Sequence, residues 1–143
     1  MQYSYKNSLG LLSRTIAKDL GKKLELKAKA NGFTITAAQW SVISMLQHEK
    51  SSTQKEISQV FGYDKVMVLR IIKKLEDNGW VKQQICQNDK RSRIVQLTET
   101  GKKLYEKILP VAQETLNAAY HSLTAQEVNF YLEISEKIRK NLK

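Results

Sequence analysis

The feature that most constrains this chain is the segment from Asp89 to Gly101, with the sequence DKRSRIVQLTETG. Its residues Ser92 to Thr98 predict a strand, and Thr98 can cap a helix that begins directly after it. The segment therefore reads as the tip and return strand of a short hairpin that runs straight into a helix. Arg91 and Arg93 would lie at the tip, and an arginine-tipped hairpin can reach a narrow, electronegative DNA minor groove.

The segment upstream of this hairpin, from Ser52 to Gly79, reads as two short helices around a tight turn. Asp64 can cap the second helix, which would run to about Asn78 and end at Gly79. Its inward positions are apolar, namely Val68, Ile72 and Leu75. The first strand of the hairpin is predicted at residues 81–86, with turn residues at 87–90. A helical pair followed by a basic hairpin predicts a winged helix-turn-helix.

Three further helix starts carry the capping box, in which a hydroxyl and a Glu or Gln side chain satisfy free backbone N–H groups. The three matches are Thr36-x-x-Gln39, Thr53-x-x-Glu56 and Thr124-x-x-Glu127. They predict helices over residues 36–49, 53–61 and 124–142.

Two longer helices complete the expected order. From about residue 8 to residue 31, apolar side chains recur at spacings of three and four, as in an amphipathic helix, at Leu9, Leu12, Ile16, Leu20 and Leu24. Thr98 should open another helix to about residue 122, and Pro110 should kink it. Together with the last helix they carry more apolar surface than a small winged core can cover. A two-fold homodimer would bury this surface and hold two recognition helices at a fixed spacing.

The predicted fold class is therefore mainly α with a small β-hairpin wing. We expect a single domain over residues 1–143, because the length fits one domain. Within it, residues 36–98 should form the winged helix-turn-helix region for DNA binding. Residues 1–35 and 99–143 should form a helical dimerisation region.

The chain is strongly basic, with a formal net charge of +10, which favours a polyanionic partner. Residues 1–35 hold seven Lys or Arg against two Asp or Glu, and residues 64–94 hold eight against four. Charge alone does not separate nucleic acid from an anionic membrane, so a membrane-binding first helix is an alternative. No apolar run approaches the roughly 20 residues of a membrane span, and the start lacks the apolar segment of a signal peptide. We expect a cytoplasmic protein with no membrane partner.

Nothing in the sequence predicts an enzyme, a cofactor or a metal site. There is no Gly-rich phosphate loop, serine nucleophile elbow or HExxH motif. His48 and His121 lie far apart and lack ligands at metal-binding spacing. Cys86 is the one cysteine, which excludes an internal disulfide and fits a reducing compartment. Lys82 and Lys90 lie nearby in the sequence, so redox sensing is an alternative role for Cys86, but without a resolving cysteine a structural role is the simpler interpretation.

The order of elements and three short segments resemble the MarR (multiple antibiotic resistance regulator) family over nearly the whole chain. The segments are Asn88-Asp89-Lys90-Arg91, Val95-x-Leu97-Thr98-x-x-Gly101, and Leu75-Glu76-Asp77-Asn78-Gly79-Trp80-Val81. The resemblance implies a dimeric regulator of double-stranded DNA, commonly a repressor, whose DNA affinity often falls when a small aromatic or phenolic ligand binds.

The same resemblance assigns roles to four residues. It implies that Asp89 braces the wing, that Arg91 enters the minor groove, that Arg70 meets DNA from the recognition helix, and that Lys74 faces the backbone. The chain departs from the family pattern where small hydroxyl residues are common, because it has Val66, Met67 and Leu69. These apolar side chains suggest contact with thymine methyl groups, unless some of them pack inward. The full predicted DNA-binding set adds the cations of the helix and wing: Lys65, Val66, Met67, Leu69, Arg70, Lys73, Lys74, Asp89, Arg91 and Arg93.

Each of these signals has an ordinary alternative. A charged outward face is common on helices, and surface ion pairs at a turn stabilise little. For an aromatic effector, Trp40 and Tyr120 are candidate walls of a crevice, with Arg14 or Lys18 to neutralise a carboxylate, although large aromatics are more often core residues. The leading function is a homodimeric, ligand-responsive repressor. The alternative is a constitutive or architectural DNA-binding protein without an effector.

Overall fold

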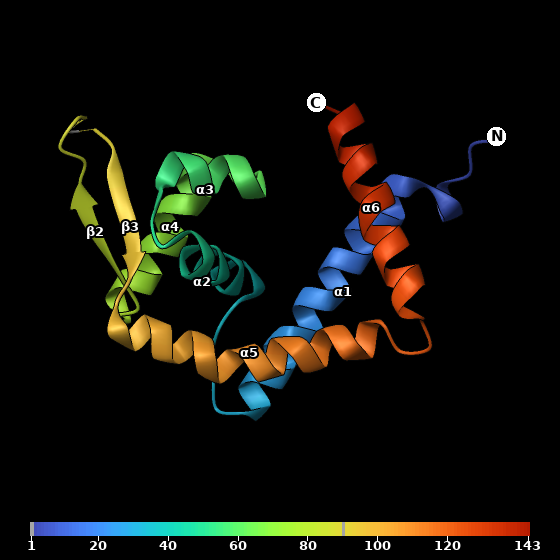
Figure 1. Ribbon diagram of the computed structural model, residues 1–143, viewed down its shortest axis with the longest axis horizontal. Coiled ribbons are helices and arrows are strands. Elements are labelled where there is room, and N and C mark those ends of the chain that lie inside the picture. Colours follow the sequence, from blue (N-terminus) through green and yellow to red (C-terminus); the bar gives the residue numbers. More distant parts are fainter. Residues whose placement is uncertain (1, 90) are drawn as a thin grey trace.

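The computed structural model describes residues 2–89 and 91–143 and is mainly helical (Figure 1). Its elements in chain order are η1 (Tyr5–Asn7), α1 (Leu9–Ala30), α2 (Ala37–Glu49), β1 (Ser52–Thr53), α3 (Gln54–Phe61), α4 (Lys65–Asp77), β2 (Val81–Ile85), β3 (Arg93–Leu97), α5 (Glu99–Ala119) and α6 (Ala125–Asn141). The predicted order of elements, with four helices followed by a hairpin and two further helices, is confirmed.

Local side-chain chemistry sets the helix starts, as the capping boxes predicted. Thr36 Oγ1 accepts from the backbone N–H of Gln39 at 3.1 Å, and Gln39 Oε1 accepts from the backbone N–H of Thr36 at 3.0 Å. The same reciprocal pair opens α3 and α6. At α4, the carboxylate of Asp64 accepts from the Met67 N–H at 2.7 Å. Each cap satisfies N–H groups that have no partner inside the helix.

The wing sheet has three strands rather than the two of the predicted hairpin. Its order is β1-β3-β2, and both pairings are antiparallel. The additional strand β1 has only two residues, with Ser52 opposite Val95 and Thr53 opposite Ile94. Ser52 is buried and its hydroxyl donates to Glu56 Oε2 at 2.9 Å. The wing is therefore attached to the start of α3 as well as to the end of α4.

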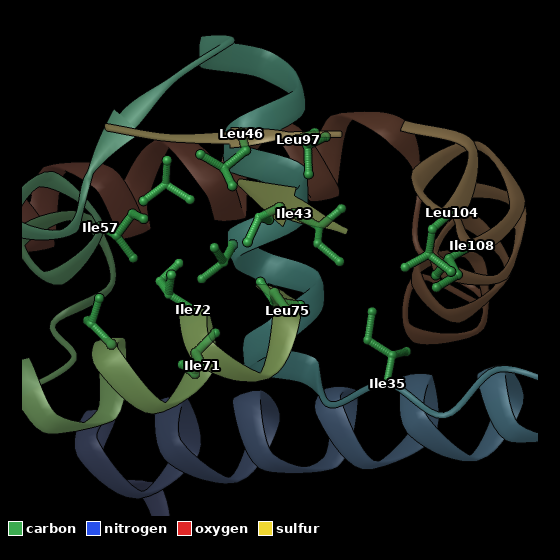
Figure 2. Close-up of a cluster of buried hydrophobic side chains, with 14 of the residues drawn as sticks. Ile35, Ile43, Leu46, Ile57, Ile71, Ile72, Leu75, Leu97, Leu104 and Ile108 are labelled. Atoms are coloured by element: carbon green, nitrogen blue, oxygen red, sulfur yellow. The ribbon is translucent and has the colours of Figure 1, made fainter. Parts of the chain in front are cut away.

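The core lies between α2, α3, α4 and β3, where apolar side chains from all four elements meet (Figure 2). The fully buried large side chains of these elements are Val42, Ile43, Leu46, Ile57, Val68, Ile72, Leu75 and Val95, and Ile108 of α5 is fully buried as well. Figure 2 also shows Ile35, Leu104 and Ile108 grouped to one side, where the segment before α2 meets α5. Burial of this kind stabilises by roughly 1.5–3 kcal/mol per large side chain, so the core holds the helix-turn-helix and the wing as one unit.

A tight junction joins the end of β3 to the end of α4. The Thr98 N–H donates to the Trp80 carbonyl at 3.0 Å, and the Thr98 hydroxyl donates to the Gly79 carbonyl at 2.6 Å. The same hydroxyl oxygen accepts from the Gly101 N–H at 3.0 Å and so caps α5. A Cβ at Gly101 would overlap the Trp80 carbonyl. The spacing Thr98-x-x-Gly101 is thus a packing requirement of this junction.

The terminal helices extend away from the winged part (Figure 1). The long α5 runs from the wing to the far end of the molecule, with Pro110 inside it. Helix α1 packs on α5, and its two buried residues, Leu24 and Ala28, lie in its second half. In contrast, no residue of α6 is buried among the residues that the structure describes. The kink that we expect at Pro110 stays a prediction.

Candidate nucleic-acid interface

The helix α4 divides into an apolar side and an outward side. Its buried residues are Val68, Ile71, Ile72 and Leu75, which pack into the core at helical spacing. Every other residue of α4 is exposed, including all seven that the sequence predicts to bind DNA, namely Lys65, Val66, Met67, Leu69, Arg70, Lys73 and Lys74. The alternative that the apolar three pack inward is therefore wrong.

The wing tip is shaped by Asp89. Its carboxylate accepts from the Arg91 backbone N–H at 3.0 Å, and its carbonyl accepts from the Ser92 N–H at 3.0 Å. Asp89 thus bends the chain and leaves the guanidinium of Arg91 exposed. Lys90, which belongs to the predicted turn, lies outside the described residues. The predicted support of Arg91 by Asp89 is therefore made through the backbone N–H of Arg91, within a turn.

A groove of about 960 Å³ lies between α3, α4 and the wing. Five of its lining residues are cationic and two are acidic, namely Lys55, Lys65, Lys73, Arg91 and Arg93 against Glu76 and Asp89. The groove therefore brings Arg91 and Arg93 of the wing and Lys65 and Lys73 of α4 to one positively charged surface. Lys74 is not among its lining residues and instead lines a second cavity on another side of α4.

A chain of side-chain hydrogen bonds crosses the floor of this groove. Gln54 Nε2 donates to Gln83 Oε1 at 2.8 Å, and Gln83 Nε2 donates to Glu76 Oε2 at 3.1 Å. The chain joins α3, β2 and α4, so it ties the position of the wing to the two helices. Because Gln83 donates a hydrogen bond to one carboxylate oxygen of Glu76, it also partly compensates the negative charge of Glu76 in the groove.

Sequence reasoning missed the contribution of α3. Gln54, Lys55, Ser58 and Gln59 all line the groove. The signal was present for Lys55 and Gln59, which lie one turn apart on the side of the predicted helix opposite the apolar Ile57. Lys55 adds a cation that the predicted set lacks.

Comparison with protein families decides the identity of this arrangement. The family model described as MarR family matches residues 35–92, which run from the segment before α2 to the wing tip. The chain belongs to the MarR family.

Relatives and a solved structure of this family extend the comparison. The chain is 38% identical over 96 residues to YwoH of Bacillus subtilis, an uncharacterised HTH-type transcriptional regulator, and the match spans 67% of this chain and 65% of YwoH, just under two thirds of its length. It is 27% identical over 135 residues to the transcriptional repressor MprA of Escherichia coli, with 92% of this chain and 77% of MprA covered. A mutant of MarR from Escherichia coli, in complex with operator DNA, superposes with a TM-score of 0.80 at 27% identity, covering 91% of this chain and 92% of that one.

Membership in the MarR family has two direct consequences. The small sheet beside the helix-turn-helix is the MarR winged fold, as the predicted fold class required. MarR regulators are not enzymes, so the expectation that the chain has no enzymatic activity is confirmed.

Over residues 2–89 and 91–143, the residues predicted to bind an effector line neither the groove beside the wing nor the second cavity. Trp40 stacks on Tyr105 of α5, with ring centroids 5.3 Å apart and planes 10° apart. Arg14 and Lys18 are exposed on α1, and Tyr120 is half-buried at the end of α5. The second cavity, of about 340 Å³, lies instead where the segment before α2, the end of α4 and α5 meet, and its lining is Gly32, Phe33, Thr34, Ile35, Lys74, Asn78, Trp80, Leu104 and Ile108.

Outside the groove, the described part of the chain offers few groups for redox or metal chemistry. Cys86 is a half-buried free thiol that follows β2. Over residues 2–89 and 91–143, no group of three His, Cys, Asp or Glu side chains is placed to hold a metal ion. No helix in those residues is long and apolar enough to cross a membrane.

Proposed function

We propose that this MarR-family chain is a sequence-specific transcriptional repressor that binds operator DNA as a homodimer. The observation that carries the proposal is the groove between α4 and the wing, because its lining has a net positive charge, which attracts a polyanion. Helix α4 enters the major groove, and Arg91 and Arg93 at the wing tip reach the flanking minor groove. The sugar–phosphate strand between the two grooves of DNA then passes along the protein groove.

The DNA-contacting residues divide by position. Lys65 and Lys73 line the groove and face one phosphate strand, while Lys74 on another side of α4 faces the strand across the major groove. Arg70 lies one turn beyond Val66 on the outward face and reads bases. Asp89 acts indirectly by shaping the wing tip. Phosphate contacts supply most of the affinity, and base contacts supply the sequence preference.

The homodimer is supported by the apolar faces of α1, α5 and α6. Large side chains on these helices and the segments beside them are exposed in the single chain, namely Leu9, Leu12, Ile16, Leu116, Leu123, Phe130, Tyr131, Leu132, Ile134 and Leu142. An apolar surface this extensive is unfavourable in water. A second copy of the chain covers it and fixes the spacing of the two α4 helices, as a two-fold operator requires.

The test is a titration of the full chain against a duplex selected from a random library, at several salt concentrations. We expect the logarithm of the binding constant to fall with the logarithm of salt with a slope on the order of −6 to −10, because each neutralised phosphate releases a counterion. Competing random duplex should bind far more weakly. Equal affinity for selected and random duplexes would instead favour the architectural DNA-binding protein, and a slope near zero would exclude DNA as the partner.

We further propose that a small aromatic acid lowers the DNA affinity by binding between the helical region and the winged part. Such a ligand acts only if it prefers the DNA-incompetent spacing of the two α4 helices. Trp40 and Tyr120 are the proposed walls, with Arg14 rather than Lys18 as the proposed counter-ion. The stacking of Trp40 on Tyr105 means that the ligand has to displace or extend this pair.

Operator binding measured with a panel of aromatic acids, for the wild type and Trp40→Ala, tests the effector. We expect at least one acid to weaken wild-type binding and to lose its effect on the variant. An effect that persists in Trp40→Ala places the ligand elsewhere, and the cavity lined by Phe33 and Trp80 is then the next site to test. No effect from any acid at millimolar concentration favours the constitutive DNA-binding protein.

A further inference from the structure

The outward face of α4 carries apolar side chains that nothing in the described part of the chain covers. Val66 is 63% exposed, Leu69 is 45% exposed and Met67 is 37% exposed. Isolated apolar residues on a surface are ordinary. These three instead stand in the first five residues of a helix whose remaining outward positions are mostly charged.

Their placement on the helix separates Val66 and Leu69 from Met67. At about 100° per residue, Val66, Arg70 and Lys73 share one face, and Leu69 lies about 60° to the side of the groove. Leu69 indeed lines the cationic groove together with Lys65 and Lys73. Met67 is turned about 100° the other way, and it is the least exposed of the three.

The charges around Val66 and Leu69 identify what covers them. Lys65, Arg70 and Lys73 are exposed on the same part of α4, so a second copy of this surface would bring like charges together. A polyanion with apolar groups between its phosphates fits better. In the major groove of DNA, the one apolar group on a base edge is the C5-methyl group of thymine, and the first residues of a recognition helix are those that meet base edges.

We propose that Val66 and Leu69 recognise thymine through its C5-methyl group, which makes them the residues that set the preference of α4 for thymine. The proposal rests on the DNA-binding function proposed above. It specifies that each half-site has thymines opposite the start of α4, and that the preference comes from methyl burial rather than from hydrogen bonds.

The experiment replaces thymine by deoxyuridine, which lacks only the methyl group, at single positions of the selected duplex. Burial of one methyl is worth about 0.8 kcal/mol, so we expect roughly fourfold weaker binding at each contacted thymine and roughly 15-fold weaker binding when both half-sites are changed. Substitutions outside the contacted positions should leave the dissociation constant unchanged.

Protein variants separate recognition of the methyl group from an effect of uracil on DNA shape. Val66→Ala and Leu69→Ala should each bind thymine and uracil duplexes with nearly equal affinity at one position of the half-site. Leu26→Ala, at an exposed apolar residue of α1 outside the DNA-binding set, is the matched control and should keep the wild-type ratio. All three residues are exposed, so the variants should fold as the wild type does, which their melting temperatures check.

The outcomes distinguish this proposal from the one beneath it. Absence of any duplex binding overturns the DNA-binding function itself. Selective duplex binding with equal affinity for thymine and uracil overturns the methyl proposal and leaves the DNA-binding function in place. Discrimination that survives in both Val66→Ala and Leu69→Ala also overturns it, because other residues then read the methyl group.

Discussion

The winged part and the terminal helices of this chain bury their apolar residues to very different extents. Around Ile43, Ile57 and Ile72 the side chains are fully buried, and the elements that carry them are short. The 17 residues of α6 include no buried one among the described residues, although the helix is as regular and as well capped as the others. The difference shows that a good helix sequence and a complete core are separate properties. On our proposal, the winged part is folded by its own core and the terminal helices are half of an interface.

The largest expected effect comes from placing charge on the apolar face of α6. Ile134→Glu combined with Ile138→Glu should dissociate the proposed dimer, because two carboxylates would be buried against the partner subunit. DNA affinity should fall by at least about 100-fold, since two linked half-site contacts become one. Light scattering after size exclusion and DNA titration measure the two effects. Glu133→Gln, on another face of α6, is the control, and a double variant that stays dimeric would contradict our assignment of the interface.

The next effect concerns the junction within the winged part. Gly101→Ala should lower the free energy of unfolding by about 3 kcal/mol, because the added methyl overlaps the Trp80 carbonyl and the backbone has to move. Gly10→Ala is the matched control, because nothing lies within 4 Å of a Cβ there, and it should be neutral or slightly stabilising. Chemical denaturation of both variants measures the difference. Equal stabilities would mean that the junction is looser than its hydrogen bonds indicate.

Arg91→Ala should separate binding from stability. We expect a loss of roughly 1–3 kcal/mol in DNA affinity and an unchanged melting temperature, because the side chain is exposed at the wing tip. Titration at fixed salt measures the affinity, with Lys107→Ala on α5 as a control for the loss of one positive charge. A variant that loses stability but keeps its affinity would contradict the proposed role of the wing.

The smallest effect is expected from the hydrogen-bond chain on the groove floor. Gln83→Leu removes the contacts to Gln54 and Glu76 and should cost about 1 kcal/mol of stability. DNA affinity should fall a few-fold, because the wing is held less firmly against α4 and Glu76 is left with a free carboxylate. The neighbouring Gln84→Leu, which is exposed, is the comparison. If the two variants behave alike in both stability and DNA titration, the chain does not position the wing.

The parts of the fold that sequence alone determined are those set by neighbours along the chain. Capping pairs such as Thr36 and Gln39 are three residues apart, so the same few side chains both signal the helix start and make its hydrogen bonds. The buried positions of α4 follow from apolar spacing in the same way. The resemblance to the MarR family also rested on such short segments, and comparison confirms it.

Tertiary structure alone decided the features that join distant residues. The strand β1 is two residues long, too short for any periodic pattern, and it exists because Ser52 meets Val95 of β3. The Gln54–Gln83–Glu76 chain, the approach of Gly101 to Trp80 and the stacking of Trp40 on Tyr105 likewise depend on where the core places each backbone. A local pattern records which face of an element is apolar, whereas the partner of that face is chosen by packing across the whole chain. Val66 and Leu69 are apolar in the sequence, but only the fold leaves them outside the core, among the cations of α4.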